Sequence, residues 1–161
     1  MLVDFQSLSD ESKIWIYPSS RKFYKEEIGE IEAQVKDFVT TWKSKDENFK
    51  ASFEIKYNRF IVLAAEDSKA PLSGAEIDES VAFIISLQSK YDVILLDRLN
   101  VCFKQGEFVQ YKDLKEFKKL IKNKSVSKKS IIFDNLISNL ADYREFWEIP
   151  ITDSWYNRFL K

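Results

Sequence analysis

The chain of 161 residues contains no histidine, one cysteine and three glycines. Histidine has the side-chain pKa closest to neutrality, and it is the most frequent general base and metal ligand. Its absence excludes a Ser-His-Asp triad, a Cys-His pair and the usual zinc sites. Gly29, Gly74 and Gly106 lie far apart, so no glycine-rich loop can cradle a phosphate. The sequence therefore predicts no catalytic residue, no metal site and no cofactor.

Long hydrophobic runs are also missing. Fully apolar runs, such as residues 81–85, are far shorter than a membrane span. Residues 1–13 lack the basic and apolar regions of a signal peptide. Cys102 is the only cysteine, which excludes an internal disulfide and suits a reducing compartment. We therefore expect a cytoplasmic protein that makes no contact with a membrane.

The composition that remains is that of a globular protein. Hydrophobic residues make up 45% of the chain, charged residues 32% and aromatic residues 15%, so we expect a core rich in aromatic side chains. Glycine and proline are too scarce to form a linker between two domains. The sequence therefore predicts one domain over residues 1–161.

Hydrophobic spacing predicts six elements in the first part of the chain. Residues 12–17, 51–57, 59–65 and 92–96 read as strands, with Asn58 at a tight turn. Residues 24–43 have the spacing of an amphipathic helix, and Ser73 and Glu76 have that of a capping box at the start of a second helix. The order strand, helix, strand, strand, helix, strand fits a ferredoxin-like (βαββαβ) core.

The rest of the chain predicts additions to that core. Residues 101–104 and 107–111 indicate a hairpin around Gly106, 114–123 a third helix and 131–133 a short strand. The aromatic tail over residues 142–161 either covers the core or forms an oligomer contact, and its last turns look helical. We expect an α+β fold in which helices pack on one face of an antiparallel sheet.

Two short motifs look like parts of an ATPase. Residues 72–76 (LSGAE) resemble the signature sequence of ABC transporter ATPases, and residues 93–97 (VILLD) resemble a Walker B strand. However, the chain has no phosphate-binding P-loop, and Arg98 stands where that family has a catalytic glutamate. A helix cap at Ser73 and an apolar core run at 93–96 explain both motifs. We therefore expect no autonomous ATPase activity.

A wider similarity covers nearly the whole chain. Segments 51–60 (ASFEIKYNRF), 96–108 (LDRLNVCFKQGEF) and 147–160 (WEIPITDSWYNRFL) resemble a family of small uncharacterised bacterial proteins. Members of that family are sometimes labelled as ABC transporter ATPases. Because the family has no established activity, the resemblance implies no catalytic residues.

One group of polar residues is a candidate ligand site. Asp97, Arg98 and Asn100 precede the predicted hairpin, and Tyr57 and Arg59 lie at the other turn. Together they could line one end of the sheet and bind a small ligand or support an enzyme. Cys102, between two apolar residues, is expected to be buried rather than nucleophilic.

Charge is distributed unevenly along the chain. Residues 112–129 contain eight lysines and two acidic residues, although the formal net charge of the whole chain is −1. Lys115, Lys119 and Lys122 would share a helix face that could bind RNA or another polyanion. Our leading interpretation is a non-enzymatic domain that binds another protein or itself. Polyanion binding and a small-ligand or enzymatic site at residues 97–100 are the alternatives.

Overall fold

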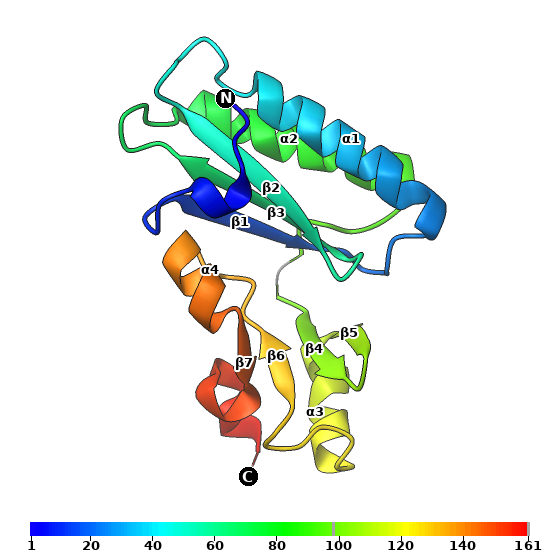
Figure 1. Cartoon of the computed structure of the whole chain (residues 1–161). Coiled ribbons are helices and arrows are strands. Elements are labelled where there is room, and N and C mark those ends of the chain that lie inside the picture. Colours follow the sequence, from blue (N-terminus) through cyan, green and yellow to red (C-terminus); the bar gives the residue numbers. More distant parts are fainter. Residues whose placement is uncertain (98, 161) are drawn as a thin grey trace.

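The computed structural model describes residues 1–97 and 99–160. Over these residues the chain forms two antiparallel sheets with four α-helices, which confirms the α+β class (Figure 1). A three-stranded sheet lies under two long helices, and a four-stranded sheet with the third helix lies at the other end of the molecule. The N-terminus is on the first part and the C-terminus is on the second.

The first sheet has the order β1-β3-β2, with β1 at Lys13–Pro18, β2 at Lys50–Lys56 and β3 at Phe60–Glu66. The apolar run in β3 predicted a central strand, and this is confirmed because Phe60 through Ala65 are fully buried between the neighbouring strands. Tyr57 and Asn58 both have positive φ, of 55° and 53°, in the turn from β2 to β3. The tight turn expected at Asn58 is therefore confirmed.

Helices α1 (Lys25–Thr41) and α2 (Gly74–Tyr91) cover one face of this sheet. The Ser73 hydroxyl accepts a hydrogen bond from the Glu76 amide at 3.1 Å, and the Glu76 carboxylate accepts one from the Ser73 amide at 2.8 Å. The capping box is thus confirmed. Trp42, fully buried at the end of α1, packs its ring against Trp15, Phe38 and Phe49.

The strand predicted at residues 92–96 is wrong. Buried and exposed side chains alternate in this segment as in a strand, because Val93 and Leu95 are buried and Ile94 is exposed. The segment nevertheless pairs with no strand of either sheet. The backbone amides of residues 94–96 bind side chains instead of a neighbouring strand. The Gln88 side-chain carbonyl accepts hydrogen bonds from the amides of Leu95 and Leu96 at 2.7 and 3.0 Å, and the Ser20 hydroxyl accepts one from the Ile94 amide at 2.9 Å. The first five elements therefore follow the ferredoxin-like order, and the fourth strand of that fold is missing.

The outer edge of β1 is bound by a later part of the chain instead. The Ile14 amide donates to the Ser138 carbonyl at 3.0 Å, and Lys13 and Asn139 form an isolated antiparallel bridge. Helix α4 (Leu140–Phe146) follows directly and lies on the face of the sheet opposite α1 and α2 (Figure 1). This helix was not predicted from the sequence.

The second sheet has the order β5-β4-β6-β7. Its strands are β4 (Val101–Gln105), β5 (Phe108–Lys112), β6 (Ile131–Phe133) and β7 (Glu148–Pro150), and α3 (Leu114–Lys122) packs against it. Gly106 has φ of 62° in the predicted hairpin turn. The remaining elements are three short 3-10 turns, which are η1 (Phe5–Ser7), η2 (Ile151–Asp153) and η3 (Trp155–Phe159).

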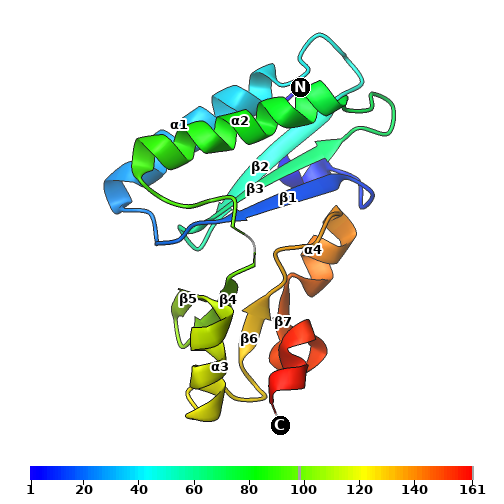
Figure 2. The ribbon, with the colours of Figure 1, turned by 180° about the vertical axis from the view of Figure 1, so that it is seen from behind.

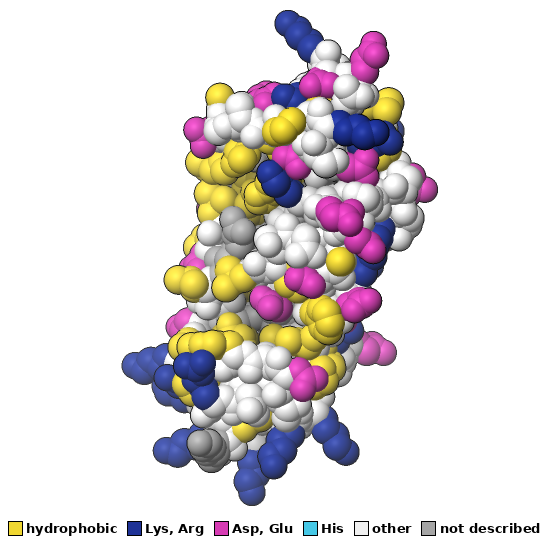
Figure 3. Space-filling model, turned by 90° about the vertical axis from the view of Figure 1, so that its left-hand side faces the viewer, with side chains coloured by type: hydrophobic (Ala, Val, Ile, Leu, Met, Phe, Trp, Pro, Cys, Tyr) yellow, Lys and Arg dark blue, Asp and Glu magenta, His cyan; other side chains and the backbone are white. Residues whose placement is uncertain are grey.

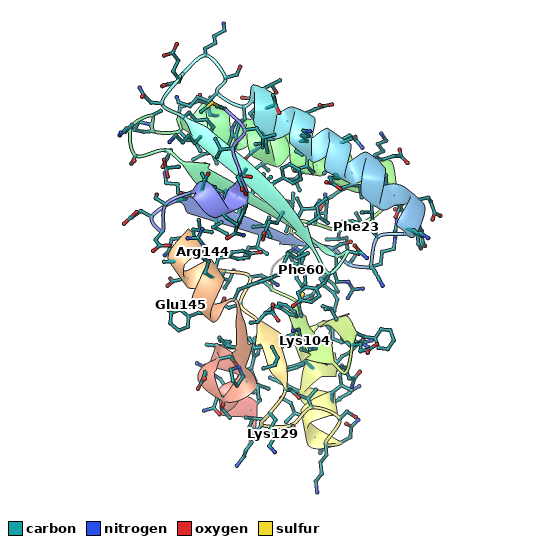
Figure 4. All side chains as sticks on the ribbon, in the orientation of Figure 1. Phe23, Phe60, Lys104, Lys129, Arg144 and Glu145 are labelled. Atoms are coloured by element: carbon teal, nitrogen blue, oxygen red, sulfur yellow. The ribbon has the colours of Figure 1, made fainter. Side chains whose placement is uncertain are left out.

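An aromatic cluster joins the two sheets. The Phe60 ring lies 4.9 Å from Phe133 and 5.0 Å from Trp147, centroid to centroid. The Trp147 ring also stacks on Tyr143 at 5.0 Å, and its indole N–H donates to Asn135 Oδ1 at 2.9 Å. Figure 4 shows Phe60 between the first sheet and the strands of the second. The two sheets therefore share one buried core at their junction.

Candidate functional site

The predicted ligand residues Asp97 and Asn100 shape the connection between the two sheets. Asp97 accepts hydrogen bonds from the Leu99 amide at 3.0 Å and from the Asn100 side-chain amide at 3.1 Å. Asn100 also donates to the Tyr111 hydroxyl at 2.9 Å. These bonds hold the loop before β4, and Arg98 lies outside the described residues.

Tyr57 and Arg59 lie across the junction and bind the second sheet. The Arg59 guanidinium donates to the Val109 carbonyl at 2.8 Å, and burial lowers the pKa of Arg59. The Tyr57 hydroxyl donates to Glu148 at 2.6 Å, and Glu148 also forms an ion pair with Lys104. Burial and the hydrogen bond to Glu148 raise the pKa of Tyr57.

The four predicted ligand residues that the structure describes are not gathered in one cavity. Tyr57 and Arg59 line a hollow of about 250 Å³ beside the β2–β3 turn. Asn100 lines a different and larger groove, and Asp97 lines neither. The structure thus uses these side chains mainly to connect the two sheets.

Cys102 lies in the shared core. Its side chain is 1% exposed, and burial raises the pKa of its thiol to about 12. A thiol with that pKa is protonated near neutrality, so it is a poor nucleophile. The buried position expected for Cys102 is confirmed. Among the described residues, no group of three or more Cys, Asp or Glu side chains could hold a metal ion.

A groove with a volume of about 660 Å³ lies on the second sheet. Its floor comes from β6 and β7, one wall from the start of α3 and the other from η3. Figure 2 shows α3 and the C-terminal turns on either side of β6. The lining residues are Leu99, Asn100, Leu114, Ile132, Phe133, Asp134, Asn135, Leu136, Ile149, Asp153, Ser154, Trp155 and Tyr156.

The rim of this groove exposes large apolar side chains. Leu99 is 80% exposed, Leu136 65% and Trp155 54%. The Tyr156 ring is partly buried in the wall, and burial is the largest cause that raises the pKa of Tyr156. Clustered exposed apolar side chains around a concave surface are typical of a binding site. We therefore take this groove, called the β6–β7 groove below, as the candidate functional site.

The aromatic tail is buried in part and exposed in part. Tyr143 and Trp147 are buried in the junction core, as expected for a tail that covers the core. Phe146 and Trp155 are exposed, at 52% and 54%, and Trp155 lines the β6–β7 groove.

The predicted basic face is present on α3. Lys115, Lys119 and Lys122 are all exposed, and within the described chain none of them forms an ion pair. Figure 3 shows Lys and Arg side chains around the lower end of the molecule, and Figure 4 places Lys129 at this end. A band of hydrophobic side chains lies above them in Figure 3.

The ATPase-like motifs have structural roles here. Ser73 and Glu76 cap α2, and Asp97 follows a segment that belongs to no strand. The Walker B geometry, in which an aspartate ends a buried strand, is therefore absent at Asp97.

Comparison of the chain with protein-family models, with curated proteins and with solved structures gave no match. The resemblance to a bacterial family accordingly stays a prediction. Within the described residues, no helix is both long and apolar enough to cross a membrane.

Sequence reasoning did not find the β6–β7 groove. Its walls come from segments around residues 99, 114, 134 and 154, which no local pattern connects. The nearest thing to a sequence signal was Leu136, which stands between an asparagine and an isoleucine just after a short strand. The sequence does not show that its side chain is exposed, and only the fold brings it into the same groove as Trp155.

Proposed function

We propose that this chain is a non-enzymatic, cytoplasmic binding domain that holds a short segment of another protein in the β6–β7 groove. The observation that supports this most strongly is the exposure of Leu99, Leu136 and Trp155 around one concave surface. Tryptophan is a frequent energetic anchor at protein interfaces because it buries a large area with little loss of side-chain entropy. The remaining lining is mixed, with apolar floor residues and a few polar groups that would orient a ligand.

The polar side chains that surround Tyr57 and Arg59 do not favour acid–base or nucleophilic catalysis. Tyr57, Lys104 and Glu148 are paired with one another, and Arg59 is bonded to a backbone carbonyl. The pKa of Lys104 is raised, mainly by its bond to Glu148, which keeps this amine protonated. A general base or nucleophile near neutrality needs the opposite shift.

The test is selection of peptides from a random heptapeptide display library on the immobilised chain. We expect enrichment of a common pattern by the wild-type chain and its loss with the double variant Leu136→Ala/Trp155→Ala. The matched control is Ile94→Ala/Phe146→Ala, which removes two side chains that are each 52% exposed and lie outside the groove. Failure of the wild-type chain to enrich any peptide, or enrichment that survives the groove variant, would falsify the proposal.

A second candidate is polyanion binding by α3. Lys115, Lys119 and Lys122 are exposed on one helix without an ion-pair partner among the described residues. If this candidate is right, affinity for a fluorescent single-stranded RNA falls steeply between 50 and 200 mM salt, on the order of tenfold or more, because counterions are released. Charge reversal of the three lysines should weaken binding to every RNA sequence alike. Reversal of the exposed Lys25, Lys36 and Lys69 is the control, and equal effects of the two triple variants would exclude α3 as the site.

A further inference from the structure

We infer that the β6–β7 groove selects partner segments in which a lysine or arginine stands next to an apolar residue. This inference depends on the proposed function, because it names the chemistry of the segment that the groove would hold. It is carried by two carboxylates, Asp134 and Asp153, that line the same groove as the exposed apolar rim.

Both carboxylates have free hydrogen-bonding capacity. Asp134 Oδ1 accepts one bond from the Leu136 amide at 3.2 Å, and within the described chain its other oxygen has no partner. The Asp153 carboxylate has no hydrogen bond or ion pair to any described residue, and it is exposed. Among the described residues that line the groove, none is a lysine or arginine. The groove therefore presents two carboxylates that form no ion pair with any described residue.

The partial burial of Asp134 makes a cationic partner group more favourable than an apolar one. Asp134 is only partly exposed, and it follows directly on the buried Phe133 at the end of β6. A purely apolar segment lying over it would remove water from the carboxylate without replacing the lost hydrogen bonds, which is unfavourable. An ammonium or guanidinium group replaces those bonds with charge-assisted ones.

The apolar rim favours an apolar residue next to the basic residue of the partner segment. Trp155 lies in the wall next to Asp153, and the Arg158 guanidinium already covers one face of its ring at 4.2 Å from the centroid. Leu136, two residues after Asp134, is 65% exposed. An aliphatic or aromatic side chain of the partner would bury these groups while its neighbouring cation reaches one of the two carboxylates.

The lysines of α3 do not reverse this preference. Lys115, Lys119 and Lys122 are solvent-exposed, and within the described chain none of them forms an ion pair with Asp134 or Asp153. A bound cation in the groove would contact one of these carboxylates directly. A phosphorylated or acidic segment would meet Asp134 and Asp153 as like charges.

The experiment uses the same heptapeptide library with two readouts. The wild-type chain should enrich peptides with Lys or Arg adjacent to an aliphatic or aromatic residue, at least about fivefold over the input. The variant Asp134→Asn/Asp153→Asn should still enrich peptides through the apolar rim, without the preference for Lys or Arg. The control Asp37→Asn/Asp78→Asn, which changes exposed carboxylates on α1 and α2, should keep that preference.

A binding measurement then tests the charge directly. The most enriched heptapeptide and its analogue with norleucine in place of the basic residue are titrated against each chain. We expect the analogue to bind at least about tenfold more weakly to the wild-type chain and within about twofold of the parent to the Asn variant. Thermal unfolding confirms that the variant is folded.

The possible failures are distinguishable. Enrichment of groove-dependent peptides without a basic residue overturns this inference and leaves the proposed function intact. Selection of acidic peptides also overturns it. The absence of any groove-dependent peptide overturns the proposed function and this inference together.

Discussion

The two ends of the molecule differ in how much apolar surface each buries for itself. The first sheet and its helices enclose a core of eighteen buried residues, whereas the core of the second sheet and α3 contains six. Helices α1 and α2 have 17 and 18 residues, but α3 has nine and strands β6 and β7 have three each. The larger core buries more apolar area, and hydrophobic stabilisation grows with the apolar area buried. The smaller one relies on the shared junction and leaves a groove open.

The largest expected contrast comes from removing one tryptophan from each end. Trp42→Ala empties a fully buried site and also removes the indole N–H bond to the Glu76 carbonyl at 3.0 Å. We expect a loss of about 3–5 kcal/mol in the free energy of unfolding, measured by urea denaturation. Trp155→Ala, at a side chain that is 54% exposed, should cost less than about 1 kcal/mol. Similar losses in the two variants would contradict the contrast between the two cores.

The junction should show an intermediate effect. Trp147→Phe keeps most of the ring packing but leaves the Asn135 side-chain carbonyl, which is 4% exposed, without its donor. We expect a loss of about 1–3 kcal/mol, because an unsatisfied buried acceptor is costly. Circular dichroism and fluorescence should report one shared transition if both sheets depend on this core. The control Trp155→Phe, whose indole N–H has no bond within the described chain, should change stability by less than about 0.5 kcal/mol.

A smaller effect is expected at the cap of α2. Ser73→Ala removes the side-chain acceptor for the Glu76 amide and should cost about 1 kcal/mol by chemical denaturation. Ser86→Ala, on the exposed surface of the same helix, is the matched control and should be nearly neutral. Equal losses of unfolding free energy in the two variants would show that the capping hydrogen bond of Ser73 does not stabilise the first region.

The smallest expected effect on stability is that of the Arg21–Glu27 ion pair, and it depends on pH. Arg21 and Glu27 form a two-pronged ion pair with N–O distances of 2.9 and 3.1 Å, and this bond, together with the Tyr24 amide, lowers the pKa of Glu27. Since the folded-state pKa lies below the ordinary value of 4.5, the stabilisation is present above that pH and is lost as the pH falls through the folded-state pKa. Glu27→Gln should therefore destabilise the chain at pH 7 by less than about 1 kcal/mol. The difference from wild type should shrink as the pH is lowered below 4.5, and a difference that stays constant on acidification would contradict it.

The sequence predicted the first region well because its signals are local and repeated. The spacing of Ile31, Val35 and Val39 continues over several turns of α1, and β3 is apolar on both faces. The strand expected at 92–96 failed for a different reason. Buried Val93 and Leu95 satisfy a strand pattern, but the Gln88 side chain binds the backbone that a neighbouring strand would have bound.

The second region was harder to predict because its elements are short and its site is non-local. Helix α4 has seven residues, and its aromatic side chains were read as part of a tail. Asp134 and Asp153 line one groove only because β6 and β7 pair side by side, with Ile132 opposite Ile149. Of the predicted ligand residues that the structure describes, only Asn100 reaches that groove. Lys115, Lys119 and Lys122 were correctly expected on one exposed helix, since the helical period alone fixes their position.

The order in which the junction core is assembled has a consequence during synthesis. The face of the first sheet formed by Ile14, Ile16 and Val62 is covered by residues 133–147, which the ribosome adds some seventy residues after β3 is complete. Until they emerge, a nascent chain that has already formed β1 and β3 displays a bare apolar surface. Such surfaces attract chaperones and other unfinished chains. Interrupted translation should therefore yield an aggregation-prone fragment, even though that fragment contains the larger of the two end cores.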